Sequence, residues 1–434
     1  MNSLAVNKEK MLAQAWTVPL TEMDISNWYL TEHDVVWPYF ERLRKEDPVH
    51  YTEDSRYGPF WSITRFNDIK FIDQNHKLFS SQGSIGFEDQ LEEFTTPMFI
   101  AMDPPKHDAQ RKAVSPVVAP RNLAELEPLI RSRVETILEG LPIGETFNWV
   151  DRVSIELTTQ MLATLFNFPF EDRHLLTRWS DIVTGGKNSG HVNTTEDFQR
   201  EMMECLAYFT RLWRARENEA GGFDLISMMA NNEDTKDVVN RPLEYLGNLI
   251  LLIVGGNDTT RNSISGGVLA LNKFPEQYDK LNAKPALIPN MVAEIIRWQT
   301  PLAFMRRTAL EDVEMHGKQI KKGDKVVMWY ASGNRDEETF EDAGRLIIDR
   351  PNARNHVSFG FGIHRCMGNR LAEMQLRVLW EEIQTRFRKV EVVGEPVRYR
   401  SAFVRGYSEL PVKLVPLDQL SILDQPSYQP CGYA

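Results

Sequence analysis

The sequence predicts a mainly α-helical protein, a large helical body that carries small β-sheets. Apolar residues recur at helical spacing through most of residues 123–222 and again in 242–273 and 369–388, which indicates long helices with buried faces. Two stretches rich in aromatic and β-branched residues, 49–64 and 313–330, are broken by turn residues and predict short strands. The helical stretches are much the longer, so helix dominates.

Composition and charge restrict the class of protein. The chain has 434 residues, of which 42% are hydrophobic and 26% charged, a globular composition long enough to enclose a cofactor. No linker-like run interrupts it, so we expect one domain over residues 1–434 with peripheral tails at 1–30 and 418–434. The net charge of −11 argues against a nucleic-acid partner. No apolar run is long enough for a membrane anchor, so we expect a soluble, cytoplasmic protein.

The N-terminal part mixes a helix, a hairpin and a loop. Residues 37–46 are expected to be helical, and residues 49–64 to form a hairpin on the edge of the helical body. Residues 80–99 show little periodicity. We therefore expect a loop there that lines a cavity through Ile85 and Phe87.

A pair of basic side chains follows on a short helix. Pro104 and Pro105 suit the first turn of a helix, and His107 and Arg111, four residues apart, would share one of its faces. Two such groups can bind a carboxylate, although the same pattern also suits a solvated polar face.

The middle of the chain reads as amphipathic helices. Examples are residues 126–138, 153–166 and 198–217. Residues 184–195 contain three glycines and predict a mobile loop. We expect this region to form a lid over the cavity.

A long helix over 242–273 contains a run that breaks helix rules. Its first half is apolar almost all round and predicts burial, but Gly255-Gly256-Asn257-Asp258-Thr259-Thr260 then interrupts it. Paired glycines let a flat ligand approach the backbone, Thr259 can hydrogen-bond a helix carbonyl, and Asp258 can relay protons. The alternative is an N-cap that starts a new helix at Asp258 or Thr259.

A glycine-rich loop around one cysteine precedes the last long helix. Residues 359–368 read Phe-Gly-Phe-Gly-Ile-His-Arg-Cys-Met-Gly, and a helical pattern follows over 369–388. A thiolate at a helix N-terminus is stabilised by free N–H groups and the helix dipole. Such a thiolate suits an axial bond to a haem iron, with glycines giving a flat ligand room. The alternative is a small cysteine in an ordinary turn.

The motif Phe359-x-x-Gly362-x-His364-x-Cys366-x-Gly368 resembles the haem-binding signature of the cytochrome P-450 family. The family more often has arginine at the position of His364. The resemblance extends to the glycine-interrupted helix, to His107-x-x-x-Arg111, and to Glu294-x-x-Arg297 in a helix expected over 289–300. It therefore implies the cytochrome P-450 fold, with a buried haem b.

The resemblance also implies roles for individual residues. Cys366 would be the axial ligand of the iron, while Asp258 and Thr259 would deliver protons during oxygen activation. Glu294, Arg297 and a downstream arginine, Arg350, would support the cysteine loop. The remaining haem contacts would be His107, Arg111, Arg307 (with Arg306 as the adjacent alternative), His364, Gly255, Gly256, Phe359 and Gly368.

A narrower resemblance concerns substrate. Runs such as Glu-Ile-Ile-Arg-Trp-Gln-Thr-Pro-Leu-Ala and Val-Met-Trp-Tyr-Ala-Ser-Gly-Asn-Arg-Asp look like the soluble bacterial alkane and fatty-acid terminal hydroxylases. This implies terminal hydroxylation of a linear alkane or fatty acid. Phe304 departs from that subgroup, where histidine is expected. The substrate pocket would comprise Ile85, Phe87, Leu252, Leu302, Ala303, Phe304 and Phe403.

The small number of cysteines bears on the redox partners of the protein. Its three cysteines, Cys205, Cys366 and Cys431, are too few for a thiolate-held iron–sulfur cluster, so electrons must come from separate proteins. The family implies a ferredoxin and its NAD(P)H-dependent reductase. Four basic residues would form a docking face: Lys112, Arg365, Arg370 and Arg377.

Three other functions compete with this prediction. One is hydroxylation of a terpene or another cyclic hydrocarbon, which the sequence does not exclude. A peroxide-driven haem-thiolate peroxygenase should not need the pair Asp258 and Thr259. A haem-based sensor or electron carrier should not need a proton relay in a buried helix.

Overall fold

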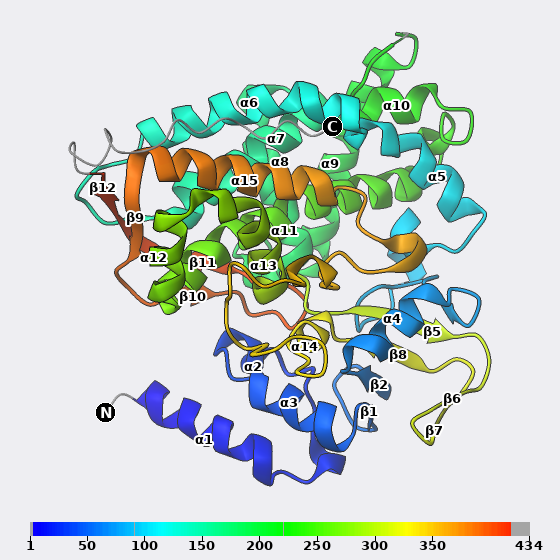
Figure 1. Ribbon diagram of the computed structural model, residues 1–434. Coiled ribbons are helices and arrows are strands. Elements are labelled where there is room, and N and C mark those ends of the chain that lie inside the picture. Colours follow the sequence, from blue (N-terminus) through cyan, green and yellow to red (C-terminus); the bar gives the residue numbers. More distant parts are fainter. Residues whose placement is uncertain (1–2, 91, 220, 418–434) are drawn as a thin grey trace.

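The structure, a computed structural model, describes residues 3–90, 92–219 and 221–417. Helices make up most of the fold, as predicted (Figure 1). In chain order the α-helices are α1 (Ser3–Thr17), α2 (Trp28–Glu32), α3 (Trp37–Glu46), α4 (Phe66–Gln74), α5 (Lys106–Val114), α6 (Pro120–Glu139), α7 (Glu156–Phe166), α8 (His174–Gly185), α9 (Thr195–Arg216), α10 (Leu225–Asn231), α11 (Pro242–Lys273), α12 (Pro275–Ala283), α13 (Ile288–Gln299), α14 (Tyr330–Gly333) and α15 (Asn369–Arg386).

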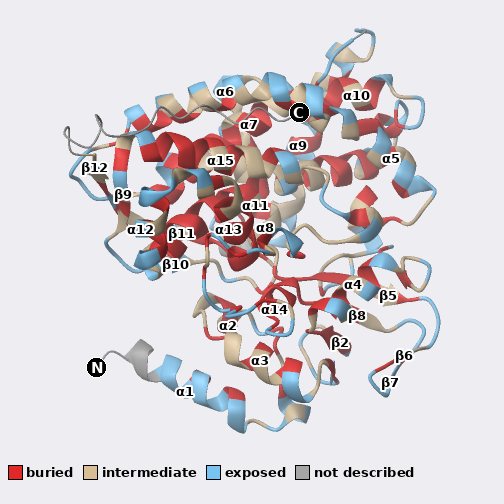
Figure 2. Ribbon diagram, viewed as in Figure 1, coloured by how far each residue is buried: buried red, intermediate tan, exposed pale blue. Residues whose placement is uncertain are grey.

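Helix α11 is the centre of the helical body. It packs against α7, α8, α13 and α15. Buried residues gather on α11, α13 and α15 (Figure 2), and α6 packs along α15. With 32 residues, α11 is about 48 Å long, which lets one helix contact most of the body.

The predicted interruption in α11 is not a break. Residues 255–260 are helical, so the alternative of a new helix that starts at Asp258 or Thr259 is wrong. The Thr259 hydroxyl donates to the Gly255 carbonyl at 2.9 Å, a bond to the preceding turn that a helix tolerates. Packing against neighbouring helices keeps α11 continuous despite the paired glycines Gly255 and Gly256.

The strands form one larger sheet and three small ones. The larger sheet has the order β1 (Val49–Thr52), β2 (Phe60–Ile63), β8 (Lys325–Met328), β5 (Met305–Ala309) and β3 (Phe79–Ser80), in which β2 and β8 are parallel. The small sheets are β4 (Phe147–Asn148) with β12 (Pro411–Pro416) and β9 (Phe387–Val392), β6 (Val313–Met315) with β7 (Lys318–Ile320), and β10 (Val397–Arg398) with β11 (Tyr407–Glu409).

The predicted hairpin is present, but the sequence reading missed β5. The hairpin pairs Val49 with Ile63 and Thr52 with Phe60. Strand β5 reads Met-Arg-Arg-Thr-Ala, which lacks the alternation of apolar and polar residues that marks a half-buried strand. Its burial comes from neighbouring strands and α-helices that the sequence does not place.

The structure describes most of the predicted N-terminal tail but not the predicted C-terminal tail. The predicted peripheral tail 418–434 lies outside the described residues. The predicted N-terminal tail, residues 1–30, is packed more closely than expected in its described part. Met11, Met23 and Ile25 are buried, and the Tyr39 hydroxyl donates to the Met11 carbonyl at 2.8 Å. Among the described residues, no helix is both long enough and apolar enough to cross a membrane.

Candidate active site

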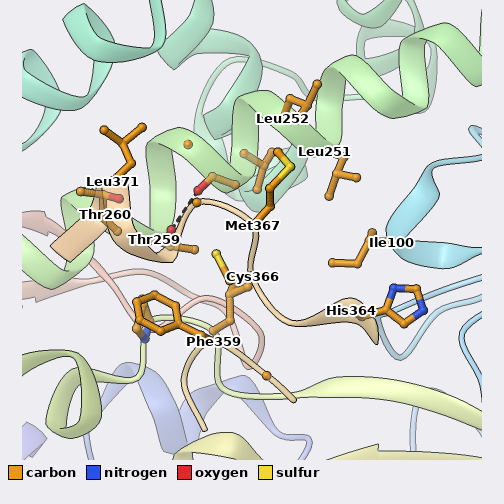
Figure 3. A pocket seen from close by; sticks show the side chains of 18 of the residues that line it. Ile100, Leu251, Leu252, Thr259, Thr260, Phe359, His364, Cys366, Met367 and Leu371 are labelled. Carbon is orange, nitrogen blue, oxygen red and sulfur yellow. Dashed lines mark hydrogen bonds between the residues drawn. The ribbon is translucent and has the colours of Figure 1, made fainter. Parts of the chain in front are cut away.

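A cavity of about 420 Å³ lies between α11 and the loop that precedes α15. Cys366 reaches it from the loop, and Thr259 and Leu252 reach it from α11 (Figure 3). Other sides come from α7, α8 and the segment 98–100. The cavity thus brings together Thr259 of the glycine-rich run and Cys366 of the cysteine loop, which are more than a hundred residues apart in the chain.

The cysteine loop has the conformation that its glycines permit. Gly360 and Gly362 have φ angles of 66° and 67°, a left-handed region that other residues rarely adopt. The Cys366 N–H donates to the Phe359 carbonyl at 2.7 Å, which closes the loop. Helix α15 begins at Asn369. Cys366 therefore lies immediately before a helix N-terminus, as predicted.

The Cys366 sulfur lies at the cavity, near the charges of two arginine side chains. The residue is accessible, and it lines the cavity, so its accessible surface faces that space. Burial among the surrounding atoms raises the pKa of the Cys366 thiol, and the Gly368 N–H together with the charges of Arg111 and Arg365 opposes this rise. N–H donors at the sulfur are the contacts that tune a thiolate ligand.

Basic side chains lie on one side of the cavity. Arg111, Arg307 and His364 line it, whereas His107 lies behind His364 with its ring centroid 4.2 Å away. Burial and the charge of Arg307 lower the pKa of His364 to about 2, so this imidazole is neutral at ordinary pH. Arg111 also donates to the Arg365 carbonyl at 2.5 Å, which ties α5 to the cysteine loop.

These residues fit a haem. Both ring nitrogens of His364 and Nε2 of His107 are buried without a hydrogen-bond partner among the described residues, and Arg111 supplies a cation beside them. The Arg111 guanidinium and the single ring N–H of the neutral His364 are donors that match the propionates of the macrocycle, whereas Nδ1 of His107 already lies 2.7 Å from Asp108 Oδ1. On α11, a Cβ added at Gly255 would meet nothing within 4 Å, so this face of the helix is open to a flat ligand.

Gly256 also has a packing role beside the predicted one. A Cβ there would lie 2.9 Å from Cδ1 of Leu162, closer than real contacts allow. Gly256 therefore permits the packing of α7 against α11, although it also borders the cavity. Phe359 and Gly368 line the cavity as expected.

The acid and the alcohol of α11 point in different directions. Thr259 lines the cavity, whereas Asp258 is fully buried and does not. Asp258 Oδ1 lies 2.5 Å from Arg261 Nη2, and its Oδ2 accepts from the Ser180 hydroxyl at 3.1 Å. Arg261 also pairs with Asp181, which is partly exposed, at 2.6 Å. Burial raises the pKa of Asp258, and Arg261 opposes this rise.

Glu294, Arg297 and Arg350 form one buried cluster. Glu294 accepts from Arg297 at 2.7 Å through each carboxylate oxygen, and from Arg350 Nε at 3.1 Å. Their side chains are at most 3% exposed.

The cluster connects to the cysteine loop through Asn334. Arg297 donates to the Asn334 carbonyl at 2.6 Å, and the Asn334 amide donates to the Ser358 hydroxyl at 2.8 Å. Ser358 immediately precedes Phe359, the first residue of the loop. The ion-pair cluster thus holds in place the backbone immediately before the cysteine loop.

The structure places some residues of the predicted substrate pocket at the cavity and others away from it. Four of the predicted residues line the cavity, namely Ile85, Leu252, Leu302 and Phe403. Phe87, Ala303 and Phe304 do not. Phe87 and Phe304 lie 4.3 Å apart between ring centroids, in an aromatic cluster with Trp329.

The alternation of an extended chain explains the correction at Phe304. Met305 and Arg307 face the cavity, so Phe304 is directed to the opposite face, as neighbours in extended backbone are. Ala303 instead pairs its N–H with the Phe403 carbonyl at 2.8 Å. The residue that departs from the expected subgroup pattern therefore belongs to the protein core.

The predicted basic docking face also needs one correction. Lys112, Arg365 and Arg370 are exposed. Arg377 is not a free cation, because it pairs with Glu127 at 2.8 Å and with Glu381 at 2.9 Å and is only 16% exposed. It ties α6 to α15.

Two positions on α11 were missed by the sequence reading. A Cβ at Gly247 would lie 2.2 Å from the Pro97 carbonyl oxygen, so only glycine lets segment 96–99 pack there. Asn248 then accepts the Phe99 N–H at 3.0 Å, and Phe99 lines the cavity. The glycine in an apolar helix was a usable signal, but its partner was not visible in the sequence.

A third missed residue is Asp73 on α4. It lines the cavity and pairs with Arg307 at 2.8 Å. A single aspartate on an amphipathic helix is usually solvated, so the sequence contained no signal for it.

Comparisons with known proteins agree with this geometry. A family model described as Cytochrome P450 matches residues 283–404. Linalool 8-monooxygenase of Pseudomonas putida is 37% identical over 91% of this chain and 99% of its own. A methyl-branched lipid omega-hydroxylase of Mycobacterium tuberculosis is 31% identical over 91% of this chain and 95% of its own.

A solved structure also matches almost the whole fold. Cytochrome P450-153 from Novosphingobium aromaticivorans is 47% identical, covers 90% of this chain and 99% of its own, and superposes with a TM-score of 0.84. Sequence identity of this level over nine tenths of the chain indicates a shared family as well as a shared fold. This chain belongs to the cytochrome P450 family and is a haem-thiolate monooxygenase whose cofactor is haem b.

Proposed function

We propose that this enzyme hydroxylates the terminal carbon of a linear alkane or fatty acid, with electrons from a ferredoxin and its NAD(P)H-dependent reductase. One observation carries the proposal: Cys366 and Thr259 border a cavity whose remaining lining is mostly apolar. Two of the similar proteins have names that state attack at a chain end or at a defined carbon, omega-hydroxylase and 8-monooxygenase. Their names support, by analogy, oxidation of an aliphatic chain.

Named residues would hold the haem. The Cys366 sulfur would bind its iron, and Arg111, Arg307, His364 and His107 would hold its propionates. When bound, the haem supplies the chemistry that activates dioxygen and inserts one oxygen atom into a C–H bond. The protein contributes binding, orientation and control of protons.

Protons would reach the cavity along α11. Asp181 is partly exposed and contacts Arg261, which contacts Asp258. Asp258 would accept a proton at its carboxylate, and Thr259, the next residue, would hold a proton at Oγ1 inside the cavity. Because Asp258 is directed away from the cavity, its side chain must change rotamer to complete the route.

The buried part of the substrate should be an uncharged alkyl chain. Outside the haem-binding group, the lining is dominated by residues such as Ile100, Leu162, Leu251, Leu252 and Phe403. Among the described lining residues, the cations are those assigned to the haem. A buried carboxylate would therefore be unpaired and costly, so a fatty acid should keep its headgroup outside this region.

A spectral titration with alkanes of graded length tests the substrate class. A change in the absorbance spectrum of the haem would report binding. We expect the dissociation constant to fall about fourfold for each added CH₂, since burial contributes about 0.8 kcal/mol per group, until the cavity is full. Product analysis should give primary alcohols.

Cyclic and branched hydrocarbons of equal carbon number are the matched controls. The 37% identity to a linalool 8-monooxygenase favours a terpene as the second candidate substrate. Tighter binding and faster turnover of the terpene than of the linear alkane would replace our proposal with that one.

Charge reversal tests the ferredoxin face. Lys112→Glu combined with Arg370→Glu should slow ferredoxin-dependent turnover at low salt, because exposed charges act mainly on the association rate, and should weaken its dependence on ionic strength. Lys322→Glu, in the turn after β7, is the matched exposed control. If the double variant kept the rate and salt dependence of the control, the ferredoxin would dock elsewhere.

A further inference from the structure

Asp73 is a buried carboxylate that joins three other segments of the chain. It lies on α4 and is 3% exposed. Its Oδ1 accepts from Arg307 Nη2 on β5 at 2.8 Å, and its Oδ2 accepts from the Tyr330 hydroxyl at 2.7 Å and from the Phe361 N–H at 3.0 Å. One side chain therefore contacts a cation of the haem side and the backbone of the cysteine loop.

The backbone of Asp73 explains a glycine of the signature. A Cβ at Gly362 would lie 2.3 Å from the Asp73 carbonyl oxygen. A Cβ at Gly360 would approach the Tyr330 hydroxyl at 3.4 Å and Asp73 Oδ2 at 3.6 Å. The glycines that we expected to give the cofactor room thus also let the loop pack against Asp73, and at Gly362 this packing is the tighter requirement.

The charges of Asp73 and Arg307 depend on each other. Both side chains are at most 4% exposed, and an unpaired ion at such a position is costly. Burial raises the pKa of Asp73, and Arg307 and Tyr330 oppose this rise. Arg307 also donates to the Arg306 carbonyl at 2.9 Å, so its guanidinium is held from two directions while it borders the cavity.

We propose that Asp73 is a positioning residue for the haem, which fixes the Arg307 guanidinium and the Phe361 amide and partly neutralises the charge that Arg307 presents to a propionate. The inference depends on the haem of the family and not on the proposed substrate. If it failed, the proposed alkane or fatty-acid specificity would stand, and the reverse also holds.

Asp73→Asn tests this with two readouts that need no turnover, the reduction potential of the haem and the rate at which haem passes to excess apomyoglobin. The amide is of equal size but carries no charge, and because one of its two polar atoms is an NH₂ donor it cannot accept both from Arg307 and from Tyr330 and Phe361. We expect haem loss to be about tenfold faster, the usual order for an outer contact of a metal site. The potential should move to a more positive value, because a negative charge near the iron is removed.

Tyr330→Phe is the matched control, since it removes one hydrogen bond to Asp73 and leaves every charge in place. Its reduction potential should equal that of the unaltered enzyme. The proposal would be overturned if Asp73→Asn had the same reduction potential and the same rate of haem loss as this control.

The double variant Asp73→Asn with Arg307→Gln covers the case in which Asp73→Asn folds poorly. It leaves no unpaired buried charge at this pair, so it should fold, and its haem loss should be close to that of Arg307→Gln alone, because Asp73 would act on the haem mainly through Arg307. Haem loss about tenfold faster in the double variant than in Arg307→Gln would show that Asp73 acts independently of Arg307 and would also overturn the proposal.

Discussion

Replacing Glu294 with alanine is expected to lower the free energy of unfolding by about 3–5 kcal/mol and to leave the purified protein largely without haem. Glu294 accepts from Arg297, from Arg350 and from the Ile347 N–H. Its loss would leave two guanidinium groups buried without a counter-charge. Domains of this kind are stable by about 5–15 kcal/mol, so the loss removes a large share. Urea unfolding and the ratio of haem to protein absorbance measure both effects.

Glu276→Ala is the matched control for this experiment. Glu276 pairs with Arg345 at 2.6 Å, but both side chains are about half exposed. Such a pair contributes about 1 kcal/mol or less, so the control should stay folded and haem-loaded. A Glu294→Ala protein with the unfolding midpoint and haem content of this control would exclude the proposed support of the cysteine loop.

Replacing Thr259 with alanine is expected to lower the product formed per nicotinamide oxidised by about tenfold, or about 1.4 kcal/mol in the proton-delivery step. Alanine removes the hydroxyl that borders the cavity and keeps α11 helical, so haem binding should be unchanged. The missing product should appear as hydrogen peroxide. Simultaneous assays of nicotinamide, product and peroxide measure the change.

Thr259→Ser separates the hydroxyl from the rest of the side chain. Serine keeps the donor and acceptor at this position and should retain most of the coupling. The proposed relay would be refuted by a Thr259→Ala enzyme that forms product as efficiently as the serine variant.

Several elements were predictable because their signals are local. Helix α11 runs from Pro242 to Lys273, as its apolar pattern and proline start predict. Cys366 lies before α15 because glycines, a cysteine and a helical run follow each other directly in the chain. Glu294 and Arg297 pair because they are three residues apart on one helix turn.

Other predictions failed because they depend on segments far apart in the chain. Arg377 looked like a free surface cation, but Glu127 of α6 lies beside it. Phe304 was assigned to the cavity, and only the pairing of β5 within the sheet directs it to Trp329. The contacts of Asp258 were also not predictable, because only the packing of α8 brings Ser180 to Asp258 and Asp181 to its partner Arg261; the relay role of Asp258 stays a proposal.

By itself, the sequence determined the helical class, the cysteine before a helix N-terminus and the glycine-rich run of the central helix. Each is encoded in continuous stretches of the chain, where spacing and side-chain chemistry suffice. The tertiary structure alone decided which side chains face the cavity and how their charges are paired. Asp73 meets Arg307, 234 residues away, because burial of a charge requires a partner from whichever segment packs against it.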